Sequence, residues 1–125
     1  MKTYKEYLSL VELIATEILN ETTDRDEAMD SVWEHVEGTA EVIYYGRAFD
    51  MIGIVWDSDG HLFNDANRDL EDSCTEAETA DFREHCCQLA RRILTSSVMD
   101  ELAERFEEIE EREASEELAE EIAAA

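Results

Sequence analysis

Ala40–Trp56, AEVIYYGRAFDMIGIVW, is apolar on nearly every side when it is read as a helix. A helix of this kind is usually buried at the centre of a bundle. We therefore expect residues 40–56 to form the central helix of the fold, with Thr39 as its N-cap. The β-branched residues of this stretch also permit a short strand near residues 41–45, and the sequence leaves that alternative open.

Amphipathic helices are predicted on both sides of this central segment. Apolar residues recur at helical spacing over residues 4–19, which predicts one buried stripe. A cap at Thr23 or Asp24 starts a second helix, and Gly38 is a plausible end for it. Trp33 of this helix is expected to point inward, and both Trp33 and Trp56 are expected to be largely buried.

Two more helices are predicted after residue 74. The first runs over residues 75–94, and the second is capped by Ser97 with Asp100 and carries Val98, Leu102, Phe106 and Ile109. Residues 61–73 could hold a short helix through Phe63, Ala66 and Leu70. The absence of proline and the presence of only four glycines favour long helices over turn-rich sheets. We therefore expect an all-α, single-domain bundle of four to five helices over residues 1–112, followed by an acidic, partly frayed tail over residues 113–125.

The charge of the chain is its most unusual property. It carries 34 Asp and Glu against 10 Lys and Arg, a formal net charge of -24 over 125 residues. Small domains ordinarily carry net charges of about 2 to 8. So few basic residues argue against direct contact with nucleic acid or with an anionic membrane, since both need Lys and Arg. With no apolar stretch long enough for a signal peptide or a membrane span, a cytoplasmic location in the host cell is expected.

No metal, cofactor or catalytic motif stands out. Asp65, Asn67, Asp69 and Glu76 match part of a calcium loop, but Leu70 occupies the position that needs glycine. The run His85-Cys86-Cys87 does not suit zinc, because adjacent helical side chains diverge by about 100°. We therefore expect no metal and no cofactor.

Nucleophilic catalysis is not supported by the cysteines and histidines. Any of Cys74, Cys86 and Cys87 could pair with His35, His61 or His85, and nothing in the sequence selects a pair. We expect a protein that is not an enzyme, and the role of the cysteines stays open. Their odd number fits a reducing compartment.

Acidic residues are densest at the C-terminal end. Between Asp100 and Glu121, 12 acidic residues stand against two arginines. Helical neighbours three or four residues apart lie about 5–6 Å apart, so a row of glutamates can imitate a phosphate backbone. We predict that this row is the partner-binding site. Its members are Glu101, Glu104, Glu107, Glu108 and Glu111.

Residues 26–49, DEAMDSVWEHVEGTAEVIYYGRAF, resemble a segment of small acidic proteins carried by bacteriophages and plasmids. In those proteins a Trp-containing helix and a Val-Ile-Tyr-Tyr segment recur together. The resemblance covers about a fifth of the chain and rests mostly on core-type residues: Trp33, Val36, Val42, Ile43, Tyr44, Tyr45 and Ala48. It implies a mobile-element context, in which acidic DNA-mimic inhibitors of restriction and CRISPR systems are common, and it assigns no functional residue.

Together these observations favour a non-enzymatic protein that binds and inhibits a basic, nucleic-acid-binding host defence protein through a DNA-mimicking carboxylate surface. The alternative is an acidic helical adaptor that modulates or assembles a protein partner without mimicry. The target and the oligomeric state are not fixed by the sequence.

Overall fold

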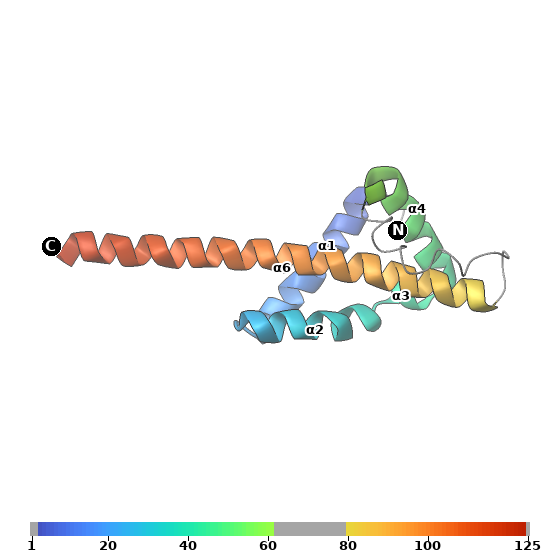
Figure 1. The fold of residues 1–125 in the computed structure, drawn as a ribbon, viewed down its shortest axis with the longest axis horizontal. Helices are drawn as coiled ribbons and strands as arrows, with labels where there is room; N and C mark the ends of the chain where they lie inside the picture. Colours follow the sequence, from blue (N-terminus) through green and yellow to red (C-terminus); the bar gives the residue numbers. More distant parts are fainter. Residues whose placement is uncertain (1–2, 62–79, 125) are drawn as a thin grey trace.

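Five helices pack together in the computed structural model, which describes residues 3–61 and 80–124 and, within these, the side chains of residues 3–61 and 83–116. No strand occurs in these two ranges, so the all-α bundle is confirmed. The helices are α1 (Tyr4–Glu21), α2 (Arg25–Glu37), α3 (Ala40–Ile43), α4 (Tyr45–Ser58) and α6 (Ala80–Ala124). Figure 1 shows the four shorter helices gathered around one half of α6, while the other half runs out beyond them.

Local capping chemistry fixes where α1 and α2 begin. The Thr3 hydroxyl accepts a hydrogen bond from the Glu6 backbone N–H at 3.2 Å. The Asp24 carboxylate accepts from two backbone N–H groups in the first turn of α2, and Gly38 is the C-cap of that helix. These contacts satisfy donors that an α-helix leaves unpaired at its start. The predicted cap at Asp24 and the predicted stop at Gly38 are confirmed.

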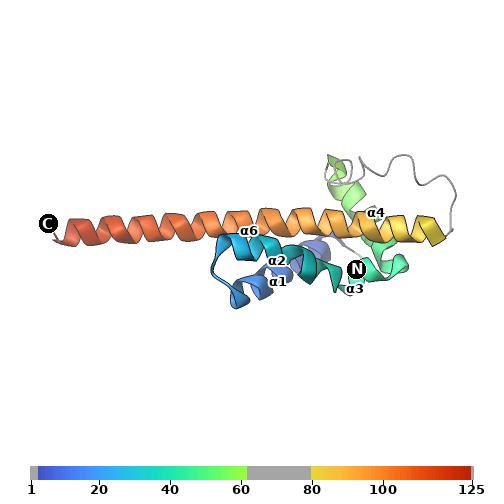
Figure 2. The same cartoon turned by 60° about the horizontal axis from the view of Figure 1, so that its bottom comes forward.

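Helix α6 lies at the centre of the fold and packs against α1, α2, α3 and α4. Six of its buried residues recur every four positions, and Leu89 and Ile93 are buried beside this series. The six are Cys86, Ala90, Leu94, Val98, Leu102 and Phe106. Four residues turn an α-helix about 40° beyond a full turn, so this ridge winds around the helix axis. Different helices can therefore cover successive parts of one ridge. Figures 1 and 2 show this arrangement, with α3 and α4 near the start of α6 and the C-terminal part of α6 left uncovered.

The prediction that residues 40–56 form one central helix is wrong. The stretch divides at Tyr44, which has extended backbone angles (φ -92°, ψ 124°) and ends α3 while it begins α4. The cause lies in the run Val42-Ile43-Tyr44-Tyr45, because β-branched and aromatic side chains lose rotamer freedom in a helix. The alternative of a strand near residues 41–45 is also not found, since Ala40–Ile43 is helical.

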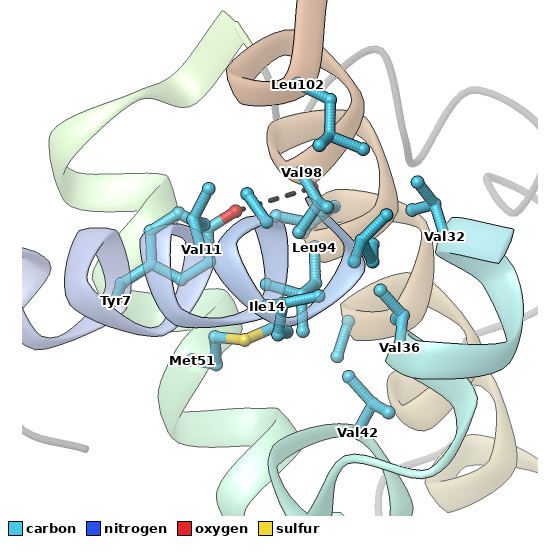
Figure 3. Close-up of a cluster of buried hydrophobic side chains, with 14 of the residues drawn as sticks. Tyr7, Val11, Ile14, Val32, Val36, Val42, Met51, Leu94, Val98 and Leu102 are labelled. Atoms are coloured by element: carbon cyan, nitrogen blue, oxygen red, sulfur yellow. Dashed lines mark hydrogen bonds between the residues drawn. The ribbon is translucent and has the colours of Figure 1, made fainter. Parts of the chain in front are cut away.

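Residues 80–124 form one helix, where the sequence predicted two with a boundary near residue 95. Ser97, the expected N-cap, lies inside α6, and its hydroxyl is hydrogen-bonded to the Tyr7 phenol of α1. The phenol also donates to the Ile93 carbonyl at 3.3 Å, and burial raises the pKa of Tyr7. Ser97, whose position resembles a helix cap in the sequence, here forms a hydrogen bond with the hydroxyl of the buried Tyr7. Figure 3 shows Tyr7 among the core side chains with Leu94 and Val98.

The two tryptophans are not core residues, which corrects another prediction. Trp33 is 45% exposed and Trp56 is 52% exposed. On α2, the buried positions are Ala28, Val32 and Val36, and Trp33 lies about 100° from Val32 around the helix. Trp33 therefore flanks the contact with α6 instead of entering it.

Truncating a core residue of α6 should cost far more stability than truncating Trp33. Leu94 is fully buried, so Leu94→Ala should lower the free energy of unfolding by about 2–5 kcal/mol. Trp33→Ala should cost less, because nearly half of that side chain stays in water. Urea denaturation of both variants checks the order. A larger loss for Trp33→Ala would contradict the placement of α2.

A second prediction concerns pH. His35 Nδ1 donates to the Ser31 carbonyl at 2.9 Å, and Nε2 lies 3.2 Å from a carboxylate oxygen of Glu21 on α1. The bond to Ser31 and the charge of Glu21 raise the pKa of His35. A raised histidine pKa gives stability that is complete below the unfolded pKa of about 6.5 and is lost as pH rises through the folded value.

His35→Gln should therefore lower the melting temperature at about pH 5.5, and the difference from the wild type should shrink as the pH rises through the raised pKa of His35. Thermal melts monitored by circular dichroism measure it. Glu21→Gln should remove the part of the pH dependence that comes from the carboxylate. A difference that stays constant across this range would show that His35 acts only through packing.

Candidate partner-binding surface

The outer side of α6 carries five exposed carboxylates in a continuous row. We define the acidic row as Asp100, Glu104, Glu107, Glu108 and Glu111, all of which are exposed. At about 100° per residue these five positions fall within roughly 100° of arc. The buried positions Val98, Leu102 and Phe106 point to a different side of the helix.

The structure gives Glu101 a different role from the rest of the predicted set. Its carboxylate is 3.0 Å from Nε of Arg105, and the side chains of both residues are only about a quarter exposed. Arg105 also donates to the Thr16 hydroxyl at 2.8 Å and to the Glu12 carbonyl at 3.4 Å, both on α1. Glu101 thus orients an arginine that ties α6 to α1.

Asp100 takes the place of Glu101 on the exposed side, and the sequence reading missed it. The signal was available, because Asp100, Glu104, Glu108 and Glu111 follow the helical steps of four, four and three. The spacing of Asp100 from Ser97 predicts a capping box instead. That interpretation depended on a helix boundary that the structure does not contain.

Arginine does not interrupt the acidic row. Arg105, the basic residue in its middle, is turned toward α1. Arg25 of α2 reaches Glu110 at 3.5 Å, on another side of α6. From Glu107 to Glu116 every described side chain is exposed, so this part of α6 has no buried face of its own.

The described cysteines do not form an activated nucleophile. Cys86 is buried in the helix contact, and the Cys87 thiol donates to the Ile43 carbonyl at 3.6 Å. Burial raises the pKa of Cys87, which disfavours the reactive thiolate. Among the side chains of residues 3–61 and 83–116, no group of three His, Cys, Asp or Glu could hold a metal ion. The calcium-like residues Asp65–Glu76 and Cys74 lie outside the described residues.

Neutralising Glu101 should lower stability, whereas neutralising its neighbour Glu104 should not. Glu101→Gln weakens the charge-assisted bond to Arg105 and should lower the free energy of unfolding by about 1 kcal/mol. Glu104→Gln removes an exposed like charge and should leave stability unchanged or slightly higher. Both variants change the net charge equally, so chemical denaturation separates the two roles. Equal changes in the free energy of unfolding for the two variants would mean that the contact between Glu101 and Arg105 does not stabilise the fold.

Helices of membrane-spanning length and hydrophobicity are absent from the two described ranges. Comparisons with protein-family models, with curated proteins and with solved structures found no match to this chain.

Proposed function

We propose that this protein binds a basic, nucleic-acid-binding host defence protein in the host cytoplasm and inhibits it by occupying its nucleic-acid site. The observation that carries the proposal is the acidic row, an unbroken line of exposed carboxylates on a helix that extends past the bundle. The sequence resemblance to phage- and plasmid-encoded acidic proteins supplies the defence context.

The spacing of the row supports mimicry of a nucleic-acid strand. Asp100 and Glu111 are eleven residues apart, which is about 16 Å along the helix axis. Five carboxylates over that length give one charge per roughly 4 Å, and one strand of B-DNA carries one charge per about 3.4 Å. A protein groove that binds a phosphate backbone would meet a similar linear charge density on α6.

Stability considerations support a binding role in preference to a purely solubilising one. Like charges three and four residues apart weaken a helix, and helices without tertiary contacts are marginal in water. A cationic partner surface would relieve this repulsion by pairing with the carboxylates. Charge complementarity of this kind mainly increases the rate at which the two proteins meet. This increase becomes much smaller as salt is added.

The experiment is an assay in which duplex DNA competes with this protein for a captured partner protein. The full-length protein is immobilised, host proteins are bound at low salt, and each captured protein is purified and tested for release by duplex DNA and by rising salt. We expect release by both. Glu104, Glu107, Glu108 and Glu111 changed together to Gln should abolish capture while the helical content is retained.

A matched control removes four acids elsewhere. Glu12, Glu17, Glu34 and Glu37 are exposed and lie on α1 and α2, so their change to Gln alters the net charge equally. The proposal requires this variant to bind almost normally. If the control loses binding and the α6 variant does not, the partner surface lies elsewhere.

The adaptor alternative is favoured by one specific observation. Large apolar side chains are exposed on α3, α4 and the residue between them: Ile43, Tyr44, Phe49 and Trp56. Exposed apolar groups of this size often mark protein interaction sites. A captured partner that binds duplex DNA and this protein at the same time, with little salt dependence, would establish the adaptor reading. Loss of capture in Phe49→Ser would support it further.

A further inference from the structure

A small pocket at the contact of α2 and α6 has the opposite chemistry to the rest of the surface. It has a volume of about 170 Å³ and is lined by Trp33, Gln88, Arg91 and Arg92. Gln88 and Arg91 point to nearly the opposite side of α6 from the acidic row, given 100° per residue, and Arg92 lies outside the arc of the row. The pocket is therefore independent of the surface assigned to the proposed function.

Arg91 is held in place by Trp33. Its guanidinium carbon lies 5.3 Å from the centre of the indole ring, which is a cation–π contact. The planar guanidinium suits such stacking, and its edge still presents N–H donors. Trp33 itself is 45% exposed, so one part of the ring remains available beside the pocket.

The Nε of Arg91 also lacks an acceptor, which is unexpected in so acidic a chain. Its Nε is buried and has no hydrogen-bond acceptor, and none of the described carboxylates lies within ion-pair distance of it. By contrast, Arg25, Arg47 and Arg105 each pair with a glutamate. A buried donor without an acceptor costs free energy, so an added acceptor would be favourable here.

We propose that this pocket binds a phosphate group, either as the free ion or on a small aromatic molecule. The Arg91 fork supplies bidentate donors for the oxygens, and the Gln88 amide and the Arg92 guanidinium line the same space. Phosphate is a dianion near neutral pH and matches a site with more than one cationic side chain. An attached ring would lie against the exposed part of Trp33.

The negative net charge does not prevent such binding, because salt limits the range of repulsion. Asp100, the nearest member of the acidic row, is nine residues from Arg91, or about 14 Å along the helix. The Debye length at physiological ionic strength is about 8 Å. Nearer acids do oppose the anion: Asp30 and Glu37 lie on the same side of α2 as Trp33. Directed hydrogen bonds therefore have to supply the affinity.

The test is a titration of the full-length protein, followed by ¹H–¹⁵N NMR of the indole and arginine N–H signals. Inorganic phosphate and phenyl phosphate are the two probes. We expect a saturable shift of the Trp33 indole and Arg91 Nε–H signals, while the Trp56 indole signal serves as the internal reference. Tighter binding of phenyl phosphate would identify an aromatic phosphate, and equal binding would identify the free ion.

Arg91→Gln should weaken binding about tenfold or more, the loss expected for a charge-assisted hydrogen bond. Arg91→Lys keeps the charge but loses the planar fork, and it should also weaken binding. The matched control is Arg112→Gln, an exposed arginine farther along α6. Shifts without saturation, or equal weakening by the Arg91 and Arg112 variants, would overturn the proposal. Circular dichroism of each variant confirms that the helices are retained.

Discussion

The winding ridge of buried residues on α6 is the feature on which the rest of the structure depends. Cys86, Ala90, Leu94, Val98, Leu102 and Phe106 are all buried and recur every four positions. Because this spacing turns the ridge about 40° per step, one helix can pack against α1, α2, α3 and α4 in succession. The core of the described residues therefore forms around α6.

The same packing sorts the few basic side chains away from the acidic row. Arg105 is directed to the Thr16 hydroxyl and the Glu12 carbonyl of α1, and Glu101 follows it into this contact. Arg91 lies against Trp33 on nearly the opposite side of α6. What remains on the outer side between Asp100 and Glu111 is a line of carboxylates with no cation within it, and the exposed Arg112 follows one turn after Glu108. Electrostatic asymmetry of this kind arises from helix packing and is not visible in the net charge.

Past Phe106, α6 changes from a core element to an exposed helix. The described side chains from Glu107 to Glu116 are all exposed, and most of them are glutamates. Helix formation there is helped by continuity with the packed half, which removes the cost of nucleation, and is opposed by like-charge repulsion. Where helix propagation and charge repulsion nearly balance, a cationic partner would make the helix more ordered. This expectation agrees with the proposed function.

Sequence alone determined the all-helical class, the span of α1, the capping of α2 at Asp24 and the density of acid near the C-terminus. These follow from local spacing and composition, which act within a few residues. It did not determine that Tyr44 divides the apolar segment, that residues 80–124 form one helix, or that Trp33 lies at the surface. It also placed Glu101 among the binding residues, whereas the structure pairs it with Arg105 and puts Asp100 on the exposed side. Those outcomes depend on contacts between residues that are distant in the sequence, such as Tyr7 with Ser97 and Arg105 with Thr16, and only the packed chain brings these together.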